Sequence, residues 1–121
     1  MNSKELQLRL KKFALRLIPL CDALPKKKVS LVIENQILRS GFSAAANYRA
    51  SCNAQFKKAF NSKLSIALEE IDEASFWLEI IDDLQLLSRN KLKLIRNEAI
   101  ELTKILGASR RTAVKKLKID N

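Results

Sequence analysis

The chain has 121 residues and a formal net charge of +10, with 47% apolar and 30% charged residues. A β-protein needs a turn signal every ~8–12 residues, and only two Gly and two Pro are present, so the composition argues against a β-rich fold and favours amphipathic helices. The length fits one domain, residues 1–121, that is long enough to bury a hydrophobic core.

The first two helices are predicted from apolar residues at spacings of three and four. The first spans about residues 4–23, with Ser3 as its N-cap and Pro19 expected to kink its last turn. The second spans about residues 29–54 and crosses Gly41, which either bends the helix or allows another element to approach closely; we favour a single kinked helix. The expected core residues are Leu6, Leu10, Phe13, Leu17 and Leu20 in the first helix and Val32, Ile33, Ile37 and Leu38 in the second.

The third helix, over residues 55–88, has apolar residues on two sides. Its main stripe is heptad-like and consists of Leu64, Ala67, Leu68, Ile71, Ala74, Leu78, Ile81 and Gln85. A second row lies off this stripe and consists of Ile66, Trp77, Ile80, Leu84 and Leu87. Because a helix that is apolar on two sides must bury both, we predict that the second row is an interface between subunits of an oligomer.

The fourth helix, over residues 91–117, has its core stripe at Leu92, Ile95, Ala99, Leu102 and Leu106, and Gly107 is expected to loosen its last third. Four helices joined by connections of a few residues can lie side by side only as antiparallel neighbours. The predicted fold is therefore all-α, an antiparallel up-down-up-down four-helix bundle.

No catalytic, metal or cofactor site is predicted. Carboxylates of the third helix suggest a bundle metal site, but such sites also use His ligands, and the chain has no His. Ser43, Cys21 and Cys52 have no His to activate them as nucleophiles, and there is no Gly-rich phosphate loop. We therefore expect two buried free thiols, no cofactor and no enzymatic activity.

A cytoplasmic location is expected. No stretch approaches the ~20 uncharged apolar residues of a membrane span, and the charged N-terminal residues lack the unbroken apolar segment of a secretory signal. We predict no membrane contact.

A polar cluster is predicted where the second helix faces the third. Small neighbouring residues let the two helices approach closely enough for hydrogen bonds. A buried network that fixes the register of the helices is favoured over a ligand site. The network is expected to include Arg39, Ser40, Ser43, Asn47, Glu70 and Glu73.

The charge is uneven along the chain, at +6 for residues 1–30, −3 for residues 31–88 and +7 for residues 89–121. Because the first and last helices of an up-down bundle are adjacent, their basic clusters are expected to merge into one positive surface suited to phosphate backbones. Solubility, helped by neutralisation against a neighbouring subunit, is the alternative explanation. The predicted nucleic-acid-binding residues are Lys11, Lys12, Arg16, Lys26, Lys27, Lys28, Arg110, Arg111, Lys115, Lys116 and Lys118.

Four stretches resemble a known bacterial family of four-helix-bundle proteins, first described from open reading frames in intervening sequences of 23S ribosomal RNA genes. They are ALRLIPLCDALPK (14–26), QILRSGFSAAANYRAS (36–51), FNSKLSIALEEIDEASFWLEII (60–81) and ELTKILGASRRTAVKK (101–116). The chain departs from the family pattern at Ala50, where Glu is often found, and at Phe42, where a small polar residue is common.

The resemblance implies a four-helix bundle that assembles as a homopentameric ring and has no attached catalytic activity. The accessory protein of diversity-generating retroelements is similar in fold and charge and is thought to bind nucleic acid and a reverse transcriptase. Two hypotheses remain open. One is a non-enzymatic homo-oligomer that binds RNA or DNA phosphates, and the other is an adaptor for a protein partner such as a reverse transcriptase.

Overall fold

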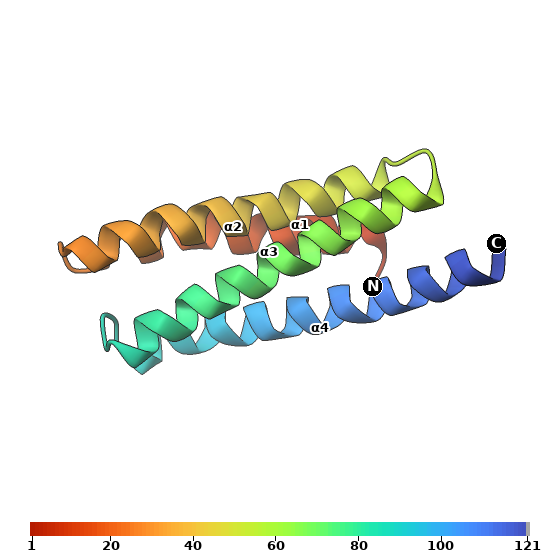
Figure 1. Ribbon diagram of the computed structural model, residues 1–121. Helices are drawn as coiled ribbons and strands as arrows, with labels where there is room; N and C mark the ends of the chain where they lie inside the picture. The colour runs from red at the N-terminus through yellow and green to blue at the C-terminus, as the bar shows by residue number, and fades with distance from the viewer. Residues whose placement is uncertain (121) are drawn as a thin grey trace.

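The apolar stripes form four helices that pack side by side, as Figure 1 shows for the computed structural model, which describes residues 1–120 without the side chain of Asp120. The helices are α1 (Ser3–Asp22), α2 (Lys28–Cys52), α3 (Lys57–Asp83) and α4 (Arg89–Asp120), and no strand occurs in the described part of the chain. Successive helices run in opposite directions. The predicted all-α, up-down-up-down four-helix bundle is confirmed.

The core receives side chains from all four helices. Most predicted stripe residues are buried, and Leu20, Leu38 and Leu68 pack against the core from its edge. Val32 was expected in the core but is 53% exposed, since it precedes the buried Ile33 and so lies on a different side of α2. The largest fully buried side chains are Phe13, Leu10, Leu17, Ile33, Ile37, Leu64, Ile71, Leu78, Ile81, Leu92, Leu102 and Leu106.

The helix ends differ from the predicted ends by a few residues. Asn2, rather than Ser3, is the N-cap of α1, because its Oδ1 accepts a hydrogen bond from the backbone N–H of Glu5 at 2.9 Å. At the other end of the chain, α4 continues through Gly107 to Asp120 without interruption. The expected loosening at Gly107 is therefore not observed.

α3 ends five residues earlier than predicted. The backbone N–H of Leu86 donates to the carbonyl of Ile81, and that of Gln85 donates to the carbonyl of Asp82, each at 3.0 Å. This is the Schellman pattern, which requires a left-handed residue, and Gln85 supplies it with φ of 55°. Gln85 thus lies in the turn and not in the core stripe.

Gly41 allows α1 and α2 to approach closely. α2 is a single helix from Lys28 to Cys52, and a Cβ atom built at Gly41 would overlap the side chain of Leu17 and come within 3.9 Å of Phe13. The buried Leu17 therefore occupies the space that a larger residue at position 41 would need.

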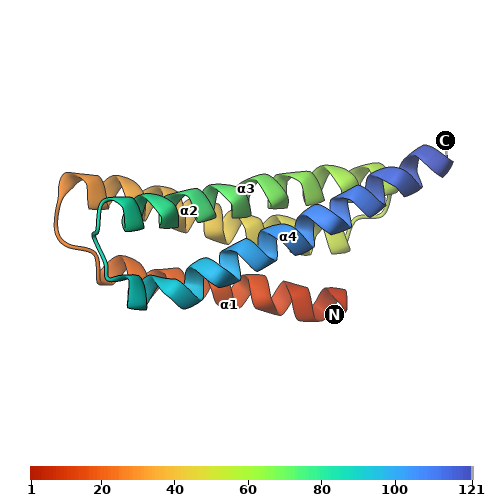
Figure 2. The same cartoon turned by 90° about the horizontal axis from the view of Figure 1, so that it is seen from below.

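The ends of α4 have different surroundings. Its first half lies beside α1 and α3, whereas its last turns extend past the turn between α2 and α3, beyond the point where α1 begins (Figures 1 and 2). This extension places the C-terminal basic residues at the edge of the bundle.

Candidate nucleic-acid interface

The helix directions separate the predicted basic residues into two groups. The α1–α2 and α3–α4 turns lie at one end of the bundle, and the N-terminus, the α2–α3 turn and the C-terminus lie at the other (Figure 1). Residues 26–28 are therefore at the opposite end from residues 110–118. A 32-residue helix such as α4 is about 48 Å long, so the prediction of one merged surface is wrong.

The basic residues in the middle of α1 also face different sides. Arg16 lines a groove between α1 and α4 together with Lys91, whereas Lys11 lines a groove between α1 and α2 together with Arg49. Lys12 is exposed. The α1 cations therefore do not join the C-terminal group.

Arg9 neutralises the two carboxylates of α4 that face α1. Its guanidinium pairs with Glu98 through Nε at 3.1 Å and through Nη2, and it lies 3.3 Å from Glu101. The hydrogen bond to Glu98 is the main reason why the pKa of Arg9 is raised. Glu98 and Glu101 are thus compensated within the bundle.

The strongest concentration of positive charge lies at the end of the bundle that contains the C-terminus. Residues 35–68 and 102–119 contain no Asp or Glu, and the chain direction brings the start of α3 and the end of α4 together there. We call the cations on the first turn of α3 and the last turns of α4 the basic end. It consists of Lys57, Lys58, Arg110, Arg111, Lys115, Lys116 and Lys118.

Two hydrogen bonds hold the end of α4 on α3. Arg110 Nε donates to Ser65 Oγ at 2.9 Å, and Asn61 Nδ2 donates to the carbonyl of Ala113 at 3.4 Å. Ala113 packs against the core. Because these partners are neutral, they fix the position of the helix without cancelling the charge of Arg110.

Lys57 and Lys58 were not predicted as members of this surface. The signal was present in the long run without acidic residues that surrounds them. They were overlooked because the net charge of residues 31–88 was considered as a whole. That net charge is negative, although the start of α3 is basic. Arg110, Arg111, Lys115, Lys116 and Lys118 lie on the last turns of α4.

Phe56 is an exposed aromatic residue at the same end. It is the N-cap of α3, directly before Lys57, and its side chain is 69% exposed. Aromatic residues were expected mainly in the core, but Phe42 and Phe76 are also 40% and 48% exposed. An aromatic face beside lysines is the arrangement on which unpaired bases stack.

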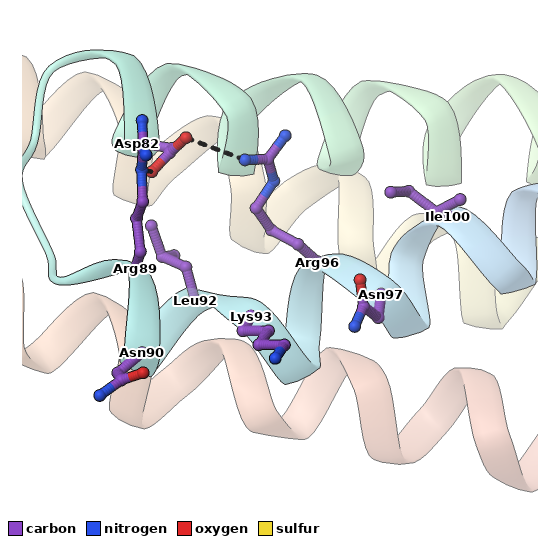
Figure 3. A pocket seen from close by; sticks show the side chains of 8 residues that line it. All are labelled: Asp82, Arg89, Asn90, Leu92, Lys93, Arg96, Asn97 and Ile100. Atoms are coloured by element: carbon purple, nitrogen blue, oxygen red, sulfur yellow. Dashed lines mark hydrogen bonds and ion pairs between the residues drawn. The ribbon is translucent and has the colours of Figure 1, made fainter.

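A second polar groove of about 410 Å³ lies at the other end of the bundle, between α3 and α4 (Figure 3). Asp82 of α3 bonds Arg96 Nη1 at 3.0 Å and Arg89 Nε at 3.4 Å, and both arginines point toward it. Lys93 lies in the same groove. Since the Asp82 carboxylate occupies both guanidinium groups, this groove is a weaker phosphate site than the basic end.

The predicted polar network divides into separate parts. Arg39 bridges α2 and α3 through Glu70 and both oxygens of Glu73, each at 2.7 Å, and hydrogen bonds to Glu73 and Glu70 raise its pKa. Ser40 instead donates to the carbonyl of Ile37, and Asn47 donates to Ser43 within α2. The cross-helix bridge therefore excludes Ser40, Ser43 and Asn47, whose partners lie in their own helix, and Arg39 is half-exposed rather than buried.

The predicted oligomer row is only partly exposed. Trp77, Ile80 and Leu87 pack against the core of their own chain, and Trp77 Nε1 donates to Glu73 at 3.2 Å. Ile66 and Leu84 are 37% and 50% exposed. The row is therefore not a continuous exposed surface, because three of its five residues pack against the core of their own chain.

The two cysteines and the acidic residues were also considered as candidate sites. Cys21 is buried, and burial together with Glu34 and Asp22 raises the pKa of its thiol to about 11, whereas Cys52 is only half-buried. Within residues 1–120 no three His, Cys, Asp or Glu side chains are grouped closely enough to hold a metal ion. In the same part of the chain, no helix has both the length and the apolar character of a membrane span.

The fold places the chain in the class of four-helix-bundle proteins, and one end of this bundle is strongly basic. The model of the family described as 23S rRNA-intervening sequence protein matches residues 5–108, so the chain belongs to that family. The matched region contains three of the four resembling stretches in full and the first half of the fourth; it ends two residues before Arg110.

A solved structure supports the same assignment. The chain is similar to the crystal structure of a protein of unknown function from the S23 ribosomal protein family of Bacteroides thetaiotaomicron, with 32% identity and a TM-score of 0.82. The similarity covers 92% of this chain and 99% of that one. No curated protein matches the chain.

Proposed function

We propose that the protein is a non-enzymatic, homo-oligomeric four-helix bundle that binds RNA or DNA through the basic end. The observation that carries this proposal is the meeting of two acid-free segments at one end of the bundle, with seven Lys and Arg residues on the first turn of α3 and the last turns of α4. Phosphate oxygens are the partners that such a group of cations favours.

The mode of binding follows from the geometry. The cations lie on helix surfaces at the edge of the bundle and not in a shaped pocket, so they are suited to contact phosphates and not to read base edges. The exposed ring of Phe56 adds a stacking partner for an unpaired base. We therefore expect little sequence preference and a preference for single-stranded over duplex nucleic acid.

Family membership supports the proposal in part. The family is named for its connection with intervening sequences in 23S rRNA, which makes RNA a natural first probe. Self-association, as the homopentamer implied by the resemblance, is part of the same proposal. It would multiply the number of basic ends in one particle and so increase avidity for a long strand.

The test compares two charge-matched variants by fluorescence anisotropy with a labelled single-stranded RNA of mixed sequence at ~100 mM salt. Replacing Arg110, Arg111 and Lys115 by Gln removes three charges from the basic end, and replacing Lys26, Lys27 and Lys28 by Gln removes three charges from the opposite end. We expect the first variant to lose affinity at least tenfold and the second to change much less.

Equal losses in both variants would show that net charge, and not the basic end, determines binding. An unaltered protein that does not bind at this salt concentration would refute the proposal. That result would favour the adaptor hypothesis, in which the bundle holds a protein partner.

A further inference from the structure

A groove between α1 and α2 exposes large apolar side chains beside positive charges. Its apolar lining includes Leu8, Leu15 and Phe42, which are 50%, 46% and 40% exposed, and its volume is about 610 Å³. We call this surface the α1–α2 groove. Its charged lining residues are Lys4, Lys11 and Arg49, and no carboxylate lines it.

The outer side of α3 has the opposite charge. Phe76 is 48% exposed there and packs edge-on against Trp77, with ring centroids 5.1 Å apart. Exposed carboxylates lie before and after it at spacings of three, four and seven, which place them on the same side of the helix. This surface, the α3 ridge, consists of Phe76 with Glu69, Asp72, Glu79 and Asp83.

These charges are not compensated within one chain. In the part of the chain that the structure describes, none of the four carboxylates of the α3 ridge and none of the three cations of the α1–α2 groove forms an ion pair. α1 and α3 lie diagonally across the bundle, and their backbones do not come close to each other. The two surfaces therefore cannot meet in the same molecule.

We infer that the α3 ridge of one copy docks in the α1–α2 groove of a second copy. Phe76 then packs among Leu8, Leu15 and Phe42, while the carboxylates beside it face the cations that rim the groove. Aromatic burial supplies the attraction, and the opposite charges set the orientation and exclude like-charged pairings. This inference rests on the self-association that forms part of the proposed function.

The contact has a consequence for the form of the assembly. Since each copy uses two different surfaces, the interface is heterologous and each copy contacts two neighbours. Such contacts close into a ring when the rotation between copies permits it. The same inference replaces Trp77, one of the five residues of the predicted oligomer row, by its exposed neighbour Phe76.

A charge exchange tests the pairing directly. A groove variant carries Lys4→Glu, Lys11→Glu and Arg49→Glu, a ridge variant carries Glu69→Lys, Asp72→Lys and Glu79→Lys, and a third protein carries all six changes. Each half-exchanged protein presents like charges to itself, whereas the full exchange restores opposite charges between the six exchanged positions. Leu94→Glu serves as a control, because Leu94 is 71% exposed and belongs to neither surface.

Mass is measured by light scattering at ~100 mM salt, and helicity by circular dichroism. We expect the unaltered protein and the Leu94→Glu control to be multimers of the 13.8 kDa chain. The groove and ridge variants should fall to 13.8 kDa, and the protein with all six changes should regain the mass of the unaltered protein. Phe76→Ser, a single surface change, should also lower the mass while helicity is kept.

The inference is overturned if the unaltered protein is monomeric, if either half-exchanged variant keeps its mass, or if the six changes fail to restore it. Binding of single-stranded RNA is measured on the unaltered protein in the same experiment. A monomer that binds RNA would refute the docking of copies and leave the basic end in place. A multimer that does not bind RNA would refute binding through the basic end and leave the docking of copies in place.

Discussion

Gly41→Ala is expected to destabilise the protein, although alanine is the better helix former. A new Cβ at position 41 would overlap the Cδ1 atom of Leu17, a side chain that is fully buried. Leu17 must therefore leave its position or push α1 away from α2. The substitution tests whether close packing of these two helices is part of the fold.

The magnitude follows from two opposing effects. Replacing Gly by Ala within a helix stabilises it by about 1 kcal/mol. Forcing an extra methyl group into a well-packed core costs about 1–3 kcal/mol. We expect a net loss of about 1 kcal/mol in the free energy of unfolding, which lowers the Tm of a chain of this size by roughly 4 °C.

Gly107→Ala is the matched control. A Cβ atom at position 107 has Arg111 Nη1 as its nearest neighbour at 3.6 Å, which is an ordinary contact. The same substitution should therefore raise stability by up to about 1 kcal/mol at this position. Urea unfolding followed by circular dichroism measures both variants under identical conditions.

A Gly41→Ala protein as stable as Gly107→Ala would refute the close approach of α1 and α2. A second measurement isolates the contact with Leu17. Leu17→Ala alone should cost about 2–5 kcal/mol, and it should cost less in the Gly41→Ala background, because the new methyl group enters the space that Leu17 vacates.

Three further outcomes are expected. Gln85→Gly should raise the free energy of unfolding by about 1 kcal/mol in urea titrations, since Gln85 has a φ of 55° that glycine adopts without strain; an unchanged or lower value would contradict the left-handed turn. The thiol of Cys21 has its pKa raised from 9.0 to about 11, so the folded state keeps a proton that the unfolded state releases. The contribution of Cys21 to stability should therefore be constant below about pH 8 and fall by about 2–3 kcal/mol as the pH rises through 9 to 11, and Cys21→Ala should remove this part of the alkaline loss. Phe56→Ala should weaken binding of single-stranded RNA roughly fivefold or more and leave both the Tm and duplex binding nearly unchanged, because the ring is 69% exposed; equal losses for single and double strands would argue against stacking.

The helices and most of the core could be predicted because apolar residues three and four positions apart lie on one face of a helix, and that face is the one that the bundle buries. Residues such as Phe13, Ile71 and Leu102 recur at helical intervals, and all three are buried. The end of α3 could not be predicted in the same way. Leu84, Leu86 and Leu87 continue the apolar pattern past Asp83, and the left-handed position that ends the helix is occupied by Gln and not by the usual Gly.

The position of the basic surface depends on which end of the bundle each charged segment reaches, and the order of charges along the sequence does not give this. Adjacent helices were expected to bring all basic clusters together, but adjacency in an antiparallel bundle leaves Lys26 and Lys116 at opposite ends of the molecule. The same limit applies to the α3 row. Trp77 and Phe76 are neighbours in sequence, and only the packing of the folded chain shows that the first is half-buried against the core and the second exposed.

The salt dependence of nucleic-acid binding tests the central claim most directly. The affinity of the unaltered protein for single-stranded RNA is measured from ~50 to ~200 mM salt. Phosphate contacts by all seven cations of the basic end give a slope of about −5 for the logarithm of the association constant against the logarithm of the salt concentration. Exchanging Arg110, Arg111 and Lys115 for Gln should make that slope less negative by about 2, and an unchanged slope, or no binding by the unaltered protein, would contradict the account.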